Sequence, residues 1–254
     1  SLVKPFIYLS GLIYADYQPT SILKDEPFTW EYDKKKWSPE NYDRKFRGDV
    51  PYYFALKESL NSPTAQVAQK TELSNIIPLM KKAGFKSDIP VLPAIALGVS
   101  EHTPFEVLQA YQTLARLGNY KKLTFITTVE DESGQVLFND AFEDHPAASQ
   151  QNLDPQKSNL NFQNGEQVID VKKSAELIGM MKQGLQTGTA KGLAHLSFSK
   201  IAAEKTGTTS KGKDTWFTGY TPHITTVVWI GFDQNLSTTL TGASGAVPIW
   251  GNYM

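Results

Sequence analysis

The chain begins Ser1-Leu2-Val3-Lys4-Pro5-Phe6-Ile7-Tyr8-Leu9-Ser10-Gly11-Leu12, and this stretch decides the fold because it is apolar on nearly every side. A helix of that composition belongs in the middle of a domain. We expect a helix from Ser1 to about Leu12, with Pro5 tolerated in its first turn. Ser1 and Lys4, three residues apart, would then lie on one face within reach of each other.

Lys4 is the candidate proton acceptor of this pair. No acidic residue occurs before Asp16, so no carboxylate on the helix would hold the lysine charged. For Lys4 to act as a neutral base near pH 7, its pKa must fall by roughly 3.4 units, which is about 4.6 kcal/mol. Burial can lower a lysine pKa by that amount. The pair therefore favours Ser1 as an activated nucleophile.

Two further motifs support a functional role for Ser1 and Lys4, because the spacing Ser-x-x-Lys alone is uninformative. It also occurs at Ser21/Lys24, Ser197/Lys200 and Ser210/Lys213. Ser59-Leu60-Asn61 offers a hydroxyl and an amide on the same side of a loop, and Lys205-Thr206-Gly207-Thr208-Thr209 is typical of a strand. Ser-x-x-Lys, Ser-x-Asn and Lys-Thr-Gly in that order are close to the motif set of penicillin-binding proteins and class A β-lactamases.

On these motifs the chain resembles the transpeptidase domain of class A penicillin-binding proteins, the bifunctional peptidoglycan synthases. The resemblance runs nearly end to end. The matching stretches are Ser1–Phe6, Trp37–Asp43, Ala55–Thr64, Ala96–Ser100 with Thr103-Pro104, Lys205–Thr209 and Asp214–Tyr220.

The resemblance implies the fold class, an α/β fold of the α+β type. A mainly antiparallel sheet would be flanked by helices, as in serine β-lactamases and D,D-peptidases. Residues 1–254 would form one transpeptidase domain, partial because the family's first strands lie upstream of the Ser-x-x-Lys motif. Within it, residues 139–170 are polar and rich in Asn and Gln, so we expect a mobile surface loop there.

The resemblance also implies three catalytic residues. Ser1 would attack the carbonyl of a D-alanyl-D-alanine stem peptide, or the ring carbonyl of a β-lactam, and form an acyl-enzyme. Lys4 would take the hydroxyl proton, although the identity of this base is disputed in the related β-lactamases. Ser59 would relay a proton between Lys4 and the leaving amine. The backbone N–H groups of Ser1 and Thr208 would form the oxyanion hole.

Substrate binding would fall to five residues. The resemblance implies that Asn61 bonds the substrate amide, Lys205 supplies positive potential, and Thr206 and Thr208 hold the terminal carboxylate. Gly207 would let the substrate backbone come close. Because side chains alternate along a strand, Lys205 reaches the same cleft as the two threonines only if its stem bends or the strand twists.

One position departs from the expected pattern. Glu204 stands before Lys205, where we expect a small residue. Alternation turns Glu204 away from the side of Lys205. We therefore expect it to affect local packing more than catalysis.

The composition limits the partners and cofactors. With 25 basic and 26 acidic residues among 254, a net charge of -1 and a pI of about 6.4, nothing points to nucleic acid. The absence of cysteine excludes thiolate nucleophiles and disulfides, and the four histidines show no metal spacing. We expect no cofactor and no metal.

The expected function is a serine D,D-transpeptidase that cross-links peptidoglycan stem peptides through an acyl-serine and is inhibited by β-lactam antibiotics. The resemblance implies a glycosyltransferase domain and a membrane anchor outside this chain, and an extracytoplasmic location on the periplasmic side of the bacterial inner membrane. No apolar run reaches 18 residues, so we do not expect this stretch to span a membrane itself. We interpret it as a fragment or one segment of a longer polypeptide.

Three other functions stay open on the sequence. A β-lactamase or D,D-carboxypeptidase of the same fold would hydrolyse the acyl-enzyme quickly, and a penicillin-sensing receptor domain would acylate and signal. In a fourth reading, Ser1 is an N-terminal nucleophile with its own amine as base. The rate at which the acyl-enzyme is deacylated separates the β-lactamase, carboxypeptidase and receptor alternatives from a transpeptidase.

Periodicity and turn signals predict the remaining elements. We expect ordered loops over residues 16–49 and a hairpin of 122–128 with 135–138. After the first helix we expect helices over 49–59, ended by Pro63, over 67–83 and over 174–186, and a closing helix within 242–254. Another helix should start at Thr103, with a buried stripe of Phe105, Leu108, Tyr111 and Leu114. The expected final strands are 201–209, 215–220 and 225–232.

Overall fold

The computed structural model describes residues 1–139, 165–209 and 212–254. Its helices are α1 (Lys4–Tyr14), α2 (Tyr52–Lys57), α3 (Asn61–Thr71), α4 (Leu73–Ala83), α5 (Pro104–Ala115), α7 (Val171–Thr187) and α8 (Ala246–Tyr253). Short 3-10 turns occupy Pro93–Leu97, Lys191–Leu193 and Ser197–Lys200. The strands are β1 (Ile22–Asp25), β2 (Trp30–Tyr32), β3 (Lys35–Trp37), β4 (Gly48–Pro51), β5 (Asn119–Tyr120), β6 (Thr128–Glu130), β7 (Val136–Asn139), β8 (Glu166–Gln167), β9 (Ala203–Thr208), β10 (Thr215–Tyr220) and β11 (Thr225–Ile230).

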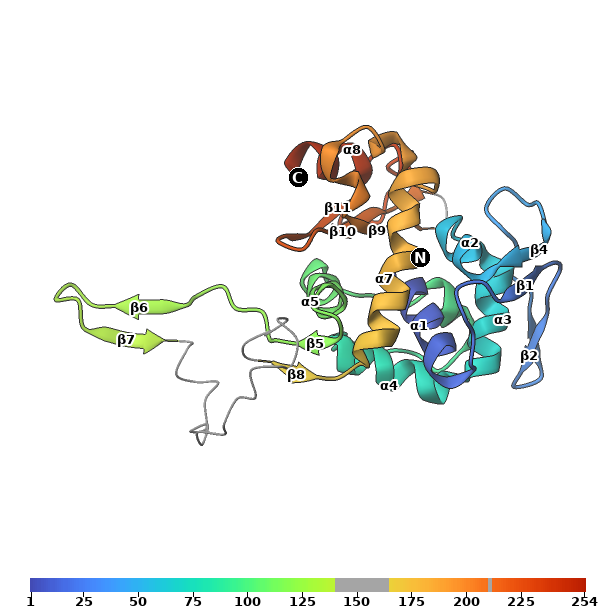
Figure 1. The fold of residues 1–254 in the computed structure, drawn as a ribbon, viewed down its shortest axis with the longest axis horizontal. Helices are drawn as coiled ribbons and strands as arrows, with labels where there is room; N and C mark the ends of the chain where they lie inside the picture. Colours follow the sequence, from blue (N-terminus) through green and yellow to red (C-terminus); the bar gives the residue numbers. More distant parts are fainter. Residues whose placement is uncertain (140–164, 210–211) are drawn as a thin grey trace.

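An antiparallel sheet in the order β11-β10-β9 forms one layer of the fold (Figure 1). Helix α8 packs on β10 and β11 from one side and α5 from the other, while α7 lies along β9. Helices α1, α3 and α4 form the second group, and α7 runs beside both groups in Figure 1. The expected fold class, an antiparallel sheet flanked by helices, is confirmed.

Helix α1 is the centre of the helical group, as its composition predicts. Residues Lys4 to Leu12 are all buried. Phe6 packs edge-on against Phe85 and Tyr111, with ring centroids 5.2 and 5.9 Å away. The helix begins at Lys4, because Ser1 to Val3 form a turn in which Lys4 N–H donates to the Ser1 carbonyl (3.1 Å). The expected start at Ser1 is therefore three residues early.

The sheet places the Lys-Thr-Gly motif on a strand at its edge. Thr206 lies opposite Phe217 and Lys205 opposite Thr218 in the register of β9 with β10. The strand expected at 215–220 is confirmed, whereas β9 and β11 are shorter than predicted. The turn after Tyr220 and the closing helix are also present.

The expected helices over 49–59 and 67–83 are partly wrong. Residues Gly48–Pro51 pair with β1 as a strand, and the helix starts only at Tyr52. Pro63 does not end a helix; it lies in the first turn of α3, where a proline removes no helical hydrogen bond. The second helix is broken in two at Glu72, whose φ is 64°.

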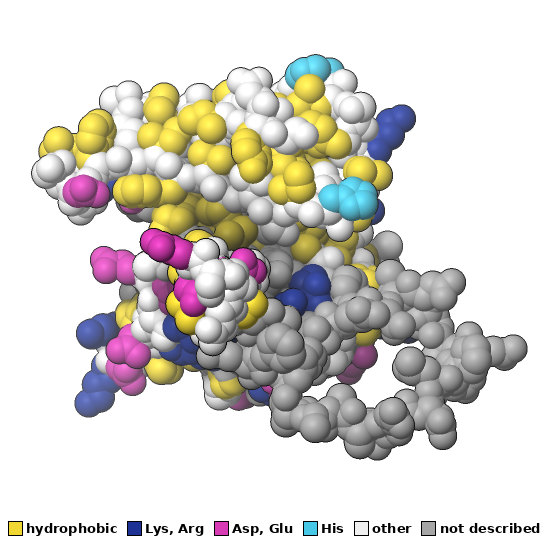
Figure 2. Space-filling view, turned by 90° about the vertical axis from the view of Figure 1, so that its left-hand side faces the viewer, with side chains coloured by type: hydrophobic (Ala, Val, Ile, Leu, Met, Phe, Trp, Pro, Cys, Tyr) yellow, Lys and Arg dark blue, Asp and Glu magenta, His cyan; other side chains and the backbone are white. Residues whose placement is uncertain are grey.

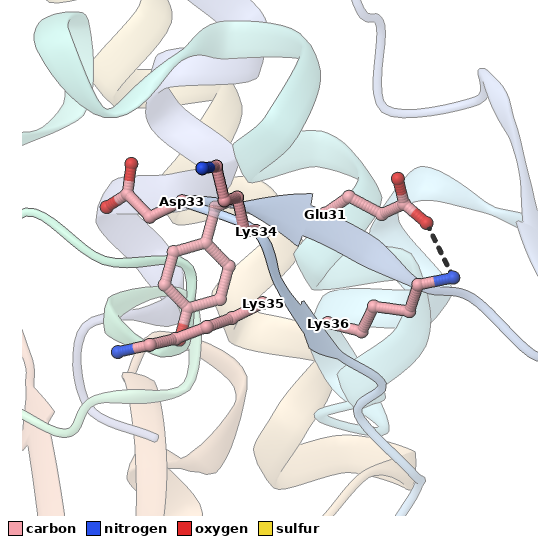
Figure 3. A pocket seen from close by; sticks show the side chains of 6 residues that line it. Glu31, Asp33, Lys34, Lys35 and Lys36 are labelled. Carbon is pink, nitrogen blue, oxygen red and sulfur yellow. Dashed lines mark ion pairs between the residues drawn. The ribbon is translucent and has the colours of Figure 1, made fainter.

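The stretch 16–49 contains short strands where we predicted loops. β1 pairs with β4, and β2 pairs with β3 as a hairpin. Strands of three or four residues are too short to show a periodic pattern. Figure 3 shows the end of the hairpin, where Lys36 pairs with Glu31 at 2.9 Å. The run Lys34-Lys35-Lys36 is exposed, as expected of a solvated face.

The helix that starts at Thr103 has the predicted capping box. The Thr103 hydroxyl accepts from Glu106 N–H (3.2 Å), and the Glu106 carboxylate accepts from Thr103 N–H (3.0 Å). Its buried stripe differs from the prediction, because Phe105 is 38% exposed and Leu108 only partly buried, while Val107 is buried.

The predicted hairpin after this helix is present but displaced. β6 begins at Thr128, not at residue 122, and pairs with β7. The predicted loop 139–170 lies mostly outside the described residues; at its end, β8 pairs with β5. Across the described ranges, no helix is both long and apolar enough to cross a bilayer.

Hydrophobic side chains gather on the face of the sheet layer shown in Figure 2. Large exposed hydrophobics in and around β11 and α8 are Ile224, Trp229, Phe232, Ile249 and Tyr253.

Helix α7 passes close to β9 at Gly184. A methyl group added at Gly184 would overlap the Glu204 carboxylate, whereas one added at Gly179 of the same helix would meet nothing within 4 Å. We predict that Gly184→Ala lowers the free energy of unfolding by about 1–3 kcal/mol, since extra atoms in a packed core are destabilising. Gly179→Ala is the matched control, and it should raise the free energy of unfolding by up to about 1 kcal/mol.

Thermal or urea unfolding of the two variants measures this difference. Equal stability of Gly184→Ala and Gly179→Ala would show that Glu204 does not pack against α7 as described.

Candidate active site

Ser59 occupies a backbone position that favours glycine. Its φ is 56°, in the left-handed region. Ser59 N–H donates to the Leu56 carbonyl (3.0 Å) and Leu60 N–H to the Ala55 carbonyl (2.9 Å), the Schellman pattern that ends a helix. Such strained residues are concentrated at functional sites. The turn connects α2 with α3 and brings the Ser59 hydroxyl and two carbonyl oxygens to Lys4.

The ammonium group of Lys4 lies inside this turn. Lys4 Nζ donates to the carbonyl oxygens of Ser59 (2.6 Å) and Leu60 (3.3 Å), to Oδ1 of Asn61 (2.6 Å) and to the Ser59 hydroxyl (3.2 Å). The side chain is fully buried. The prediction that Lys4 lies within a buried part of the domain is confirmed.

Two opposing effects set the charge of Lys4. Burial, and then the nearby charge of Lys205, hold the pKa of Lys4 well below its usual range. The oxygens of Ser59, Leu60 and Asn61 around Nζ accept hydrogen bonds from an ammonium group and therefore favour the charged form. Burial and like charge prevail, so Lys4 releases its proton more readily than an exposed lysine.

Lys205 reaches the same hydroxyl from the sheet. Lys205 Nζ donates to the Ser59 hydroxyl (3.0 Å) and to the Thr206 carbonyl (3.1 Å). Lys205 therefore reaches the Ser59 turn, next to Lys4. Ser59 Oγ accepts from both lysines, so its own proton is free for a third group.

Asn61 is fixed by contacts from three directions. Its Oδ1 accepts from Lys4, its Nδ2 donates to the Glu40 carbonyl (2.6 Å), and its backbone N–H donates to Oδ1 of Asn41 (2.7 Å). One Nδ2 proton is left for another acceptor. Its predicted role, binding a substrate amide, stays a prediction.

The two threonines of β9 have different partners. The Thr206 hydroxyl donates to the Thr189 hydroxyl (2.9 Å). The Thr208 hydroxyl oxygen accepts from Gly242 N–H (2.9 Å), so its proton can be donated elsewhere. A built Cβ on Gly207 would approach Leu2 and Trp216 to 3.2 and 3.0 Å, so glycine keeps β9 close to the start of α1.

The register of the sheet decides where the predicted oxyanion donor Thr208 points. Thr209 N–H donates to the Asp214 carbonyl of the neighbouring chain segment (3.1 Å). Because donors alternate along an antiparallel pair, Thr208 N–H points away from β10, toward the edge of the sheet. That orientation fits the predicted role.

The first residue, Ser1, is half-buried beside the two lysines. Its nitrogen donates to the Leu97 carbonyl (2.9 Å), and its predicted role as an oxyanion donor stays a prediction. Its hydroxyl has no hydrogen-bond partner among the parts of the chain that the structure describes. The structure thus brings Lys4, Ser59, Asn61 and Lys205 into one network, with Ser1 next to it.

Sequence reasoning did not single out two residues of this network. Asn41 is buried, accepts from Asn61 N–H, and donates to the Asp25 carboxylate (2.7 Å), so it fixes the start of α3. It lies in the stretch Trp37–Asp43 that carried the resemblance. Thr189 follows the end of α7 and had no sequence signal. In the described ranges, no group of three or more His, Cys, Asp or Glu side chains could hold a metal ion.

Comparison with known proteins identifies the family of this site. Residues 1–249 match the family described as penicillin binding protein transpeptidase domain. The chain belongs to this family. The resemblance seen in the motifs, the class A type included, and the expected enzyme class, a serine transpeptidase, are thereby confirmed.

Similar proteins agree with this assignment. Penicillin-binding protein 1B of Vibrio cholerae is 36% identical over the whole chain, which spans only 30% of that relative's length. Penicillin-binding protein 1A from Haemophilus influenzae has a solved structure that covers 100% of this transpeptidase domain, with a TM-score of 0.85 and 24% identity, over 41% of its own chain. The PonA1 protein from Mycobacterium tuberculosis, solved in complex with penicillin V, covers 98% with a TM-score of 0.78 and 24% identity, over 66% of its chain. These two structures support the fold.

Proposed function

We propose that this transpeptidase domain transfers the acyl group of a D-alanyl-D-alanine stem peptide to Ser1 and then to the amine of a second stem peptide. The observation that carries the proposal is the Ser59 hydroxyl, which lies between the side-chain nitrogens of Lys4 (3.2 Å) and Lys205 (3.0 Å). A hydroxyl in that position can pass a proton between a base and a leaving amine. The family of the chain supports the same reaction.

The first half of the reaction forms the acyl-enzyme. The Ser1 oxygen bonds to the substrate carbonyl carbon, and Lys4 takes the serine proton. Thr208 N–H and Ser1 N–H stabilise the oxyanion. The C–N bond then breaks, and the leaving D-alanine amine receives a proton through Ser59. In the second half, an acceptor amine attacks the ester and Ser1 recovers its proton.

The substrate would be held by its terminal carboxylate. Thr206 and Thr208 supply hydroxyl donors from one strand, and Lys205 supplies positive charge nearby. Asn61 has one amide proton left for the substrate backbone. β-Lactam antibiotics carry a carboxylate and a strained amide in the same relation, so we expect them to acylate Ser1 as well.

The setting of the domain is part of the proposal. We infer that it works within a longer polypeptide on the periplasmic side of the bacterial inner membrane, with a glycosyltransferase domain and a membrane anchor. The relative from Vibrio cholerae, of which the chain spans 30%, supports the longer polypeptide. Residues 1–254 would form its transpeptidase domain.

A peptide-transfer assay tests the proposal against its alternatives. The protein, as the cell makes it, is incubated with a pentapeptide donor ending in D-Ala-D-Ala and with an amine acceptor. The products are identified by mass spectrometry. We expect a cross-linked product that is absent in Ser1→Ala. Ser197→Ala is the matched control, because Ser197/Lys200 repeats the spacing on an exposed turn.

Two outcomes would contradict cross-linking, and a third would change the base. Hydrolysed donor without cross-linked product would assign the domain to carboxypeptidases. No turnover of peptide, with a stable penicillin adduct on Ser1, would assign it to sensing. Loss of activity when a residue is added before Ser1 would make its own amine the base.

A further inference from the structure

A buried acid at the end of strand β1 has no part in the reaction described above. Asp25 is fully buried, and both of its carboxylate oxygens have partners. Oδ2 accepts from Arg47 N–H (3.1 Å) and lies 3.6 Å from Arg47 Nη1. Oδ1 accepts from Nδ2 of Asn41 (2.7 Å). Since a buried carboxylate is costly unless it is hydrogen-bonded, these contacts make Asp25 a fixed acceptor that faces Asn41.

Asp25 decides which way the Asn41 amide points. Asn41 Nδ2 donates one proton to Asp25 Oδ1 and the other to the Lys45 carbonyl (2.8 Å). Both of these oxygens only accept, so the amide nitrogen must face them. The amide oxygen then faces the first turn of α3, where it accepts from Asn61 N–H (2.7 Å) and from Ser62 N–H (3.4 Å). The neighbours of this amide therefore fix its orientation.

The start of α3 has no capping side chain of its own. Leu60 stands at the N-cap position, and its alkyl side chain cannot accept from the first backbone N–H groups of the helix. Asn41 supplies the missing acceptor from 20 positions before Asn61. Because Asn61 is the first residue of α3, the same hydrogen bond fixes the backbone from which the Asn61 side chain extends.

The residue before Asn41 orients the Asn61 side chain. The Glu40 carbonyl accepts from Asn61 Nδ2 (2.6 Å), so the Asn61 amide oxygen turns toward Lys4 Nζ (2.6 Å). A chain of contacts thus runs from Asp25 through Asn41 and Asn61 to Lys4, with hydrogen bonds of 2.7, 2.7 and 2.6 Å. The buried acid of β1 is in this way connected to the proposed base.

We propose that Asp25 and Asn41 are positioning residues for acylation. Asp25 orients the Asn41 amide, and Asn41 holds Asn61 where its amide contacts both Lys4 and the substrate. The inference rests on the proposed function, in which Lys4 is the base and Asn61 binds the substrate amide. Neither Asp25 nor Asn41 touches the reacting atoms, so both act through Asn61.

Other contacts between β1 and α3 hold the helix in place when Asp25 is changed. The two elements lie side by side (Figure 1). Gln66 Nε2 donates to the Lys24 carbonyl (2.8 Å), and the Ser62 hydroxyl donates to the Glu26 carbonyl. A conservative variant at Asp25 should therefore fold, with the first residue of α3 misaligned.

Asp25→Asn tests the orientation, because it preserves shape and replaces one acceptor oxygen by an NH2 group. The remaining oxygen cannot serve both Arg47 N–H and Asn41, and when it serves Arg47 two amide nitrogens face each other. We expect the first-order rate constant of acylation at saturating benzylpenicillin to fall at least about tenfold, since small misplacements of reacting groups are costly. Rapid quench with intact-mass spectrometry measures this constant. It does not depend on the fraction of folded protein, so a loss of stability alone would not move it.

Exchange of the two side chains provides the second test. In Asp25→Asn/Asn41→Asp, the amide at position 25 donates to one carboxylate oxygen at position 41, and the other oxygen still accepts from Asn61 N–H. We expect the acylation constant to return to within about threefold of the wild type, a coupling that independent sites would not show. Asn41→Asp alone places two carboxylates face to face and should be at least as slow as Asp25→Asn. It gives the same test if Asp25→Asn fails to fold.

Asp43→Asn is the matched control, because Asp43 pairs with the same Arg47 (2.7 Å) but its side chain is 39% exposed. Its constant should equal that of the wild type. Equal constants for wild type and Asp25→Asn, or no recovery in the exchanged pair, would overturn the inference alone. Failure of the wild type to form the Ser1 adduct would overturn the proposed function and this inference with it, so the two failures are distinguishable.

Discussion

Replacement of Lys4 by methionine should reduce the second-order rate of acylation by benzylpenicillin by about 10²–10⁴, the usual contribution of a positioned general base. Methionine preserves the length of the buried stem and removes the amine that would take the Ser1 proton. Lys24→Met is the matched control, because Lys24 belongs to the exposed pair Ser21/Lys24 and only meets Asp49 on the surface. Its rate should equal that of the wild type.

Lys4→Met also leaves buried oxygens of Ser59, Leu60 and Asn61 without a donor, which costs about 1–3 kcal/mol for each. A pH profile of the wild type therefore provides a test that needs no variant. Since burial and Lys205 lower the pKa of Lys4, acylation should rise with pH through an ionisation well below the usual lysine range and then level off. A Lys4→Met protein that folds and acylates at the wild-type rate would exclude Lys4 as the base.

Replacement of Ser59 by glycine should slow acylation by at least about 10²-fold without loss of stability. Glycine adopts the φ of 56° freely, so the free energy of unfolding should stay equal or rise by up to about 1 kcal/mol. Ser59→Ala is the matched control: it removes the same hydroxyl but keeps the strained backbone. The two variants should share the rate loss and differ in stability, with alanine the less stable.

Acylation rates and thermal unfolding of the two Ser59 variants decide this prediction together. If Ser59→Gly acylates at the wild-type rate, the hydroxyl between Lys4 and Lys205 carries no proton in the reaction. If alanine and glycine are equally stable, the left-handed turn is not strained in the protein.

Local signals in the sequence predicted the elements that local physics specifies. The capping box of Thr103 and Glu106, the strand Thr215–Tyr220 and the burial of α1 are all present. These features depend on spacing and composition within a few residues. They are therefore readable before the structure is known.

The missed features depend on tertiary contacts. Nothing near Ser59 in the sequence shows that it adopts a left-handed turn, because glycine usually fills that place. Lys205 meets the Ser59 hydroxyl across 146 positions of sequence, and Thr189 meets Thr206 only because α7 packs along β9. The motifs named the candidate residues of the site, but the contact between Lys205 and the Ser59 hydroxyl could be seen only in the fold.

Intact-mass spectrometry after incubation with benzylpenicillin, followed by peptide mapping, tests the central claim most directly. We expect a single stable adduct on Ser1, present in Ser197→Ala and absent in Ser1→Ala. No adduct with penicillin recovered intact would mean that the motifs do not form a working cleft. No adduct with penicillin destroyed would show rapid hydrolysis and contradict a transpeptidase.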